Sequence, residues 1–126
     1  MHNPEMDGVD HINIYSKGKT ELGRKLSNWF PLRFTCEDGD FASIEGYWYW
    51  LGTHNVSLRS LSGYQAKEFG KSLPQTFKLL EVDFRTKIKK AINIKLLALR
   101  SEIIASTLPF AHYYVYGNKA KDAGYE

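Results

Sequence analysis

The stretch FASIEGYWYWLG, residues 41–52, carries the clearest signal for the fold. It contains one carboxylate, Glu45, and four consecutive aromatic residues. Ser43 is a typical helix N-cap, so the pattern predicts a helix over residues 43–51 with Glu45 in its first turn. The positive end of the helix dipole favours a negative charge at that place. A helical segment that is apolar on every side is normally buried, so residues 47–50 are expected to lie largely in the core.

Patterns on either side of this stretch predict the neighbouring elements. HINIYS, residues 11–16, alternates apolar and polar side chains and predicts a short strand. The Asp-Gly pair at 38–39 predicts a turn after a strand that contains Phe34 and Cys36. Ser62, followed three residues later by Gln65, has the spacing of a capping box and predicts a helix over residues 62–71.

A longer helix is predicted over residues 83–107, with Asp83 as its N-cap and Pro109 beyond its end. Apolar residues recur there at spacings of three and four, which predicts one buried stripe. The lysines between them, Lys95 included, are expected to face mostly solvent. The predicted stripe consists of Phe84, Ile88, Ile92, Leu96, Leu99 and Ile103.

These elements predict an α+β fold, mostly α with a few short strands, in a single compact domain over residues 1–126. Residues 1–10 are polar and are expected to be a loose N-terminal segment. The length is close to the commonest size of one domain, and 43% apolar with 25% charged residues is typical of a soluble globular protein. A net charge of +3 is compatible with a phosphate-bearing ligand without requiring one.

The expected setting is cytoplasmic, without membrane association. Cys36 is the single cysteine, which excludes an intramolecular disulfide and fits a reducing compartment. The sequence has neither an apolar signal region nor a run of about 20 apolar residues. His11, His54 and His112 lack the close spacing of metal ligands, so neither a metal nor a cofactor is predicted.

Glu45 allows two interpretations on its chemistry alone. Carboxylates next to a core are uncommon unless something pairs with them. Backbone N–H groups, or an arginine such as Arg24 or Arg33, would make Glu45 a structural residue. A carboxylate that faces a pocket would instead be a functional group.

Four stretches resemble the NADAR group of N-glycosidases. They are LSNWFPLRF at 26–34, DGDFASIEGYWYW at 38–50, SGYQAKEFGKSL at 62–73 and the long Lys-rich helix. The group includes enzymes that act on riboflavin-pathway intermediates and enzymes that remove ADP-ribose from guanine bases in DNA. The resemblance covers about residues 12–108. It is that of a divergent member of the family, for example a phage-encoded one.

The resemblance implies a compact α+β domain with a pocket for ribose-5-phosphate or ADP-ribose, in which the bond between ribose C1 and a nitrogen is cleaved. By position, Glu45 matches the family's helix-start glutamate and is the expected catalytic residue. Asn28 matches its loop asparagine, and Lys67 belongs to an Ala-Lys-Gly pattern with Ala66 and Gly70. Trp48, Trp50 or Tyr116 could stack on the leaving base. The cations expected to contact phosphate are Arg24, Lys25, Lys67 and Lys119.

The expected function is that of a hydrolase that removes ADP-ribose from a modified nucleobase, free or in DNA. Where the family continues from its glutamate through His, Tyr and Gln to Lys, this chain has Gly46, Trp48, Tyr49 and Gly52. Because these family residues are missing, hydrolysis of riboflavin-pathway ribosylamine phosphates is a less favoured alternative than removal of ADP-ribose. A non-catalytic module that binds ADP-ribose or a related nucleotide is the alternative from another class. The oligomeric state is left open.

Overall fold

The computed structural model describes residues 2–122 and divides into two compact units. One unit, called here the terminal unit, combines residues up to Ser27 with those from Arg100 onward. The other, called the central unit, is Asn28–Leu99. The mostly helical α+β fold expected from the sequence is confirmed. The expectation of one domain over residues 1–126 stays a prediction.

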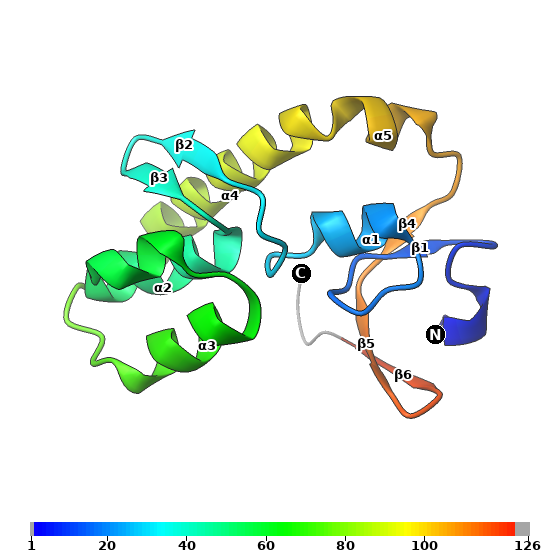
Figure 1. The fold of residues 1–126 in the computed structure, drawn as a ribbon, viewed down its shortest axis with the longest axis horizontal. Helices are drawn as coiled ribbons and strands as arrows, with labels where there is room; N and C mark the ends of the chain where they lie inside the picture. Colours follow the sequence, from blue (N-terminus) through cyan, green and yellow to red (C-terminus); the bar gives the residue numbers. More distant parts are fainter. Residues whose placement is uncertain (1, 123–126) are drawn as a thin grey trace. The chain divides into compact units, whose positions relative to one another are not determined.

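The central unit begins with a β-hairpin and continues through helices (Figure 1). The hairpin pairs β2 (Phe34–Cys36) with β3 (Gly39–Phe41) in antiparallel register, as the Asp-Gly turn predicts. The helices that follow are α2 (Ile44–Thr53), the 3-10 helix η2 (Val56–Ser60), α3 (Gly63–Ser72) and α4 (Glu81–Ala98).

Helix α2 starts where the sequence predicts. The Ser43 hydroxyl accepts a hydrogen bond from the Gly46 N–H at 3.0 Å, which satisfies one of the free donors of the first turn. The helix runs two residues past the predicted end and stops at His54, whose φ of 55° is left-handed. The His54 N–H donates to the Trp50 carbonyl at 2.7 Å, so this turn closes the helix.

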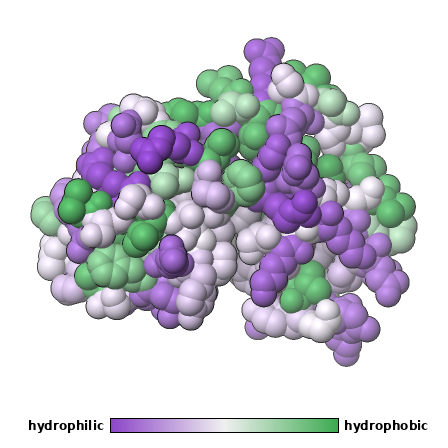
Figure 2. Space-filling view, viewed as in Figure 1, coloured by the Kyte–Doolittle hydropathy of each residue, from purple (hydrophilic) through white to green (hydrophobic). Residues whose placement is uncertain are grey.

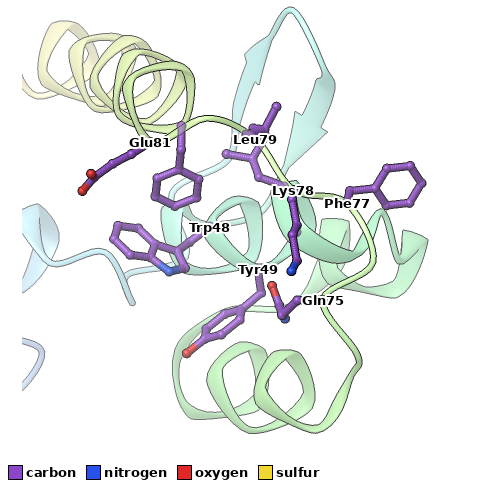
Figure 3. Close-up of a pocket in the computed structure, with 10 residues that line it drawn as sticks. Trp48, Tyr49, Gln75, Phe77, Lys78, Leu79 and Glu81 are labelled. Atoms are coloured by element: carbon purple, nitrogen blue, oxygen red, sulfur yellow. The ribbon is translucent and has the colours of Figure 1, made fainter.

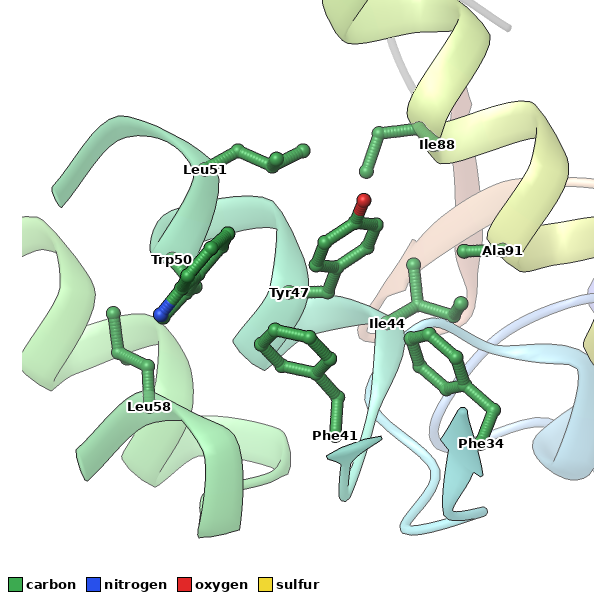
Figure 4. Close-up of a cluster of buried hydrophobic side chains, with 9 residues drawn as sticks. All are labelled: Phe34, Phe41, Ile44, Tyr47, Trp50, Leu51, Leu58, Ile88 and Ala91. Atoms are coloured by element: carbon green, nitrogen blue, oxygen red, sulfur yellow. The ribbon is translucent and has the colours of Figure 1, made fainter. Parts of the chain in front are cut away.

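Tyr47 lies near the centre of the core of this unit, among the aromatic rings of Phe34, Phe41 and Trp50 (Figure 4). Its hydroxyl donates to the Asp38 carboxylate at 2.7 Å, and Lys87 binds the same carboxylate at 3.1 Å. Burial, followed by the bond to Asp38, raises the pKa of Tyr47, so the phenol stays protonated and remains the donor. The core residues are Phe34, Phe41, Ile44, Tyr47, Trp50, Leu51, Leu58, Ile88 and Ala91.

Helix α3 packs closely on α2 because small residues face it. Ala66 is fully buried, and a side chain at Gly70 would collide with the Tyr49 ring. The predicted helix is therefore confirmed, but its capping box is wrong: the Ser62 side chain makes no capping hydrogen bond. The first helical residue, Gly63, has a φ of 57° and donates its N–H to the Trp29 carbonyl at 3.1 Å, so the chain enters the helix along a different path.

The long predicted helix is corrected in three respects. It begins at Glu81, after Leu80 rather than at Asp83, and Leu99 separates α4 from a short helix α5 (Arg100–Ala105). Leu99 has φ −104° and ψ 12°, outside the helical range. Leu96, predicted to be buried, is 37% exposed, whereas Lys95, predicted to face solvent, is only 3% exposed. The prediction is therefore wrong for both residues. Burial lowers the pKa of Lys95 to about 8.

The terminal unit contains short strands and short helices. Its elements are η1 (Pro4–Met6), β1 (Ile12–Asn13), α1 (Glu21–Leu26), α5, β4 (Phe110–Ala111), β5 (Tyr113–Tyr116) and β6 (Lys119–Asp122). Strand β1 pairs with β4 in parallel, and β5 with β6 forms an antiparallel hairpin that turns at Gly117. The predicted strand over residues 11–16 is thus present but shorter.

The N-terminal segment expected to be loose is held by Asp7 over the residues that the structure describes. Asp7 is buried, and its two carboxylate oxygens accept the backbone N–H groups of Asn13 and Lys19, each at 2.9 Å. The polarity of residues 1–10 suggested solvent exposure. The Asp7 carboxylate is instead buried, because it accepts hydrogen bonds from backbone N–H groups of the residues that follow.

His11 connects β1 to β5. The Asp10 carboxylate can only accept, so the His11 Nδ1–H donates to it at 2.6 Å. In the neutral ring Nε2 is then an acceptor, and the Tyr113 hydroxyl donates to it. The Asn13 side chain also bonds the backbone N–H and carbonyl of Tyr113, each at 3.0 Å. These buried polar bonds continue the pairing that the two-residue strand begins.

The face of the molecule drawn in Figure 2 has hydrophilic and hydrophobic residues interspersed. Within residues 2–122, no helix combines the length and the apolar character needed to cross a membrane.

The exchange of buried and exposed positions on α4 can be tested by a matched pair of variants. Ile88→Ala should lower the free energy of unfolding by about 2–5 kcal/mol, because Ile88 packs in the core. Leu96→Ala should cost less than about 1 kcal/mol, because Leu96 is partly solvated already. Urea denaturation of both variants measures the difference, and equal losses would contradict this assignment.

The connection through His11 predicts a second stability difference. Tyr113→Phe leaves the buried Nε2 of His11 without its donor, so the variant should lose about 1–3 kcal/mol of unfolding free energy. Tyr114→Phe, one residue along the same strand, removes an exposed hydroxyl and should change stability by less than about 0.5 kcal/mol. Thermal unfolding of both proteins would refute the connection if their midpoints coincided.

Candidate functional site

One side of α2 presents Glu45 together with aromatic side chains. Residues three and four positions apart lie on the same side of a helix, so Glu45, Trp48, Tyr49 and Gly52 share one face. These four residues are half-buried, whereas Ile44, Tyr47 and Leu51 on another face are buried in the core. The aromatic run is therefore divided between core packing and a partly accessible face.

The Glu45 carboxylate has two defined neighbours. The Trp29 side chain donates a hydrogen bond to it, and the positive charge of Lys67 acts on it. Lys67 lies on α3, and its Nζ is 5.7 Å from the centre of the Trp29 ring. The backbone N–H of Glu45 donates to the Asn28 carbonyl at 3.0 Å, so residues 28–29 are attached directly to the start of α2.

Burial raises the pKa of Glu45 above the ordinary value of a glutamate, although the charge of Lys67 and the bond from Trp29 act in the opposite direction. The two partners therefore only partly offset the loss of hydration. A carboxyl group with a raised pKa and specific partners is typical of functional sites.

A groove lies beside the same face of α2 (Figure 3). Its volume is about 390 Å³, within the range of small-molecule sites. Trp48 contacts Phe84 of α4 edge to face, with ring centres 4.8 Å apart. The lining residues are Trp48, Tyr49, Leu51, Gly52, Gln75, Phe77, Lys78, Leu79, Glu81 and Phe84.

The wall of the groove formed by residues 75–79 is attached to the end of α2. The Phe77 N–H donates to the Gly52 carbonyl at 3.0 Å. The His54 ring stacks between Phe77 and Trp50, with ring centres 3.7 Å and 4.3 Å away. In Figure 3 the Phe77 ring points away from the other labelled side chains, in agreement with this stack. The stack therefore fixes the path of the loop rather than filling the groove.

Tyr49 relates the groove to Glu45, which is not itself among the lining residues. Tyr49 lines the groove, and its pKa is raised by burial and then by the negative charges of Glu45 and Glu68. The phenol therefore stays protonated and lies within the field of the Glu45 carboxylate.

The structure brings together four of the residues predicted to form the site. The Asn28 carbonyl accepts the Glu45 N–H, the positive charge of Lys67 acts on the Glu45 carboxylate, and Trp48 lines the groove. The other four, Arg24, Lys25, Tyr116 and Lys119, belong to the terminal unit. Their roles toward a ligand stay predictions.

Within the terminal unit, two of the cations predicted to bind phosphate, Arg24 and Lys25, have protein partners. Arg24 donates to the Gly18 carbonyl at 2.8 Å. Lys25 forms ion pairs with Glu102 at 3.1 Å and Glu21 at 3.2 Å, and its hydrogen bonds to these two residues raise its pKa. Tyr116 and Lys119 face each other across the β5–β6 hairpin, and both are exposed.

Sequence reasoning missed Trp29 and most of the groove. Trp29 stands next to Asn28 in the quoted stretch, and its indole N–H was an available signal, since a buried Trp normally needs an acceptor. The groove residues Gln75, Lys78 and Glu81 follow no periodic pattern, so the sequence carried no comparable signal for them. Among residues 2–122, no group of three or more His, Cys, Asp or Glu side chains is arranged to hold a metal ion.

The raised pKa of Glu45 predicts how stability depends on pH. The folded chain holds this proton more tightly than the unfolded chain, so Glu45 lowers stability as pH rises from about 4 through its folded-state pKa. Glu45→Gln removes this loss and keeps an acceptor for Trp29. The variant should therefore gain in melting temperature relative to the wild type between pH 4 and pH 7. Glu68→Gln, on the exposed surface of α3, is the control for the loss of one charge. If the melting temperatures of Glu45→Gln and the wild type differed by the same amount at every pH, the raised pKa of Glu45 would be contradicted.

Comparison of the chain with protein-family models, with curated proteins and with solved structures finds no significant match.

Proposed function

We propose that this protein is an N-glycosidase that hydrolyses a ribose C1–N bond and removes ADP-ribose from a modified nucleobase, in the manner of the NADAR group. The observation that carries the proposal is the half-buried Glu45 carboxylate, with a raised pKa, on the face of α2 that also forms the aromatic groove. The resemblance of residues 26–34, 38–50 and 62–73 to that group supplies the substrate class.

The proposed chemistry uses Glu45 at the reacting carbon. Cleavage of a ribosyl C–N bond builds positive charge at C1, and a nearby carboxylate stabilises that charge. The same carboxylate orients the attacking water and accepts its proton. A raised pKa suits this second task, because the best general base has a pKa near the working pH.

The groove would hold the flat part of the substrate. Trp48, Tyr49 and Phe84 give aromatic surface for a base, and Gln75 and Lys78 give polar contacts beside it. The predicted role of Trp48 in stacking on the base fits its place in this lining. No metal or cofactor takes part in the proposed reaction, since water is the only second reactant.

The proposed partners are free ADP-ribosylated nucleobase, or DNA that carries it, in the cytoplasm. The cytoplasmic setting rests on the single cysteine, Cys36, whose free thiol fits a reducing compartment. A module that binds ADP-ribose without cleaving it would need the same groove, so only a turnover measurement separates the two functions.

Glu45→Gln separates a catalytic from a structural role of this residue. The variant should fold, bind ADP-ribose as the wild type does in a thermal-shift titration, and lose about a hundredfold or more in kcat on an ADP-ribosylated guanine oligonucleotide. The reason is that the amide keeps the shape of the side chain and removes the charge that stabilises the transition state.

Glu68→Gln is the matched control, since it removes one carboxylate from the exposed side of α3 and should keep wild-type kcat. Wild-type turnover by Glu45→Gln would refute the mechanism. Binding of ADP-ribose without turnover by the wild-type protein would instead identify a non-catalytic module.

A further inference from the structure

The loop before the β2–β3 hairpin is attached to two helices, which fixes the position of Trp29. The Asn28 carbonyl accepts the Glu45 N–H of α2 at 3.0 Å, and the Trp29 carbonyl accepts the Gly63 N–H of α3 at 3.1 Å. Because these bonds hold consecutive residues, the backbone of Trp29 has little freedom relative to either helix. Its indole ring is thus presented to Glu45 by a rigid support.

The hydrogen bond from Trp29 acts on a side chain that otherwise rotates freely at its end. The terminal torsion of a glutamate has a broad energy minimum, so an unbonded carboxylate samples many orientations. Trp29 has a single side-chain donor, the indole N–H, and the Glu45 carboxylate accepts it. This bond therefore restricts the orientation of the carboxylate.

Lys67 completes the arrangement from α3. Its Nζ lies 5.7 Å from the centre of the Trp29 ring, within the range of a cation–π contact, and its charge acts on Glu45. The neighbouring Ala66 is fully buried, which fixes the rotation of α3 and directs the next residue toward Trp29. One indole therefore contacts the carboxylate through its edge and the ammonium group through its face.

We propose that Trp29 is a positioning residue for Glu45, and that Lys67 is the counter-charge of this carboxylate rather than a ligand for substrate phosphate. The inference rests on the proposed function, in which Glu45 is the catalytic residue. It assigns Trp29 a role that the sequence did not indicate, and it changes the role that the sequence predicted for Lys67.

The first test removes the indole N–H and then restores a ring N–H. Trp29→Phe should raise the pKa of the Glu45 carboxyl. Carbon NMR of ¹³C-labelled glutamate in the ligand-free protein measures this pKa. It should also move the acidic limb of the kcat/KM profile to higher pH and lower kcat about tenfold or more, the loss expected for one bond to a charged group. Trp29→His, which again offers a ring N–H, should recover part of both effects.

The second test leaves the indole in place. Lys67→Met should raise the pKa of Glu45, whereas Lys67→Arg should keep it near the wild-type value. KM for the ADP-ribosylated oligonucleotide should stay within about threefold of wild type in Lys67→Met, since a direct phosphate contact would be worth tenfold or more. Lys71→Met, on the exposed part of the same helix, is the control for losing one positive charge.

The outcomes distinguish this inference from the proposed function. If the wild type turns over substrate but Trp29→Phe leaves both the Glu45 titration and the acidic limb unchanged, the positioning role is overturned and the function stands. If the wild type is inactive, the function fails, and the NMR titrations still decide whether Trp29 and Lys67 control Glu45. A large rise in KM with an unchanged Glu45 titration in Lys67→Met would overturn the counter-charge role.

Discussion

The rotation of α2 about its own axis is the constraint on which the rest of the central unit depends. The Ser43 cap fixes where the helix begins, and the burial of Ile44, Tyr47 and Leu51 fixes which side faces the core. Because successive residues of a helix differ in direction by a constant angle, these two conditions also fix the opposite face. Glu45, Trp48 and Tyr49 consequently lie together on the side that forms the groove.

The contact between α2 and α3 depends on a lack of side-chain volume. Tyr49 occupies the space above Gly70, and any larger residue there would collide with its ring. The fully buried Ala66 allows the same close approach one turn earlier. This approach brings Lys67 near Trp29, so the packing of small residues and the electrostatic surroundings of Glu45 have one physical origin.

Glu45 is placed at a cost to stability. Burial disfavours its ionised form more than Lys67 and Trp29 favour it, so a neutral side chain would suit the fold better near pH 7. Residues that oppose the stability of their own fold are typical of functional sites. By contrast, the buried hydroxyl of Tyr47 is satisfied by its bond to Asp38.

The sequence by itself determined the elements whose signals are local. The Ser43 cap and the Asp-Gly turn follow from residue types within a few positions of one another, because caps and turns are satisfied by neighbouring atoms. Only the tertiary structure decided the interruption at Leu99, the burial of Lys95 in place of Leu96, and the groove formed by residues 75–79. The same holds for the bond from Trp29 to Glu45, because it joins residues that come close only after α2 and α3 have packed. No local preference specifies such a contact, since its energy depends on the distance between elements.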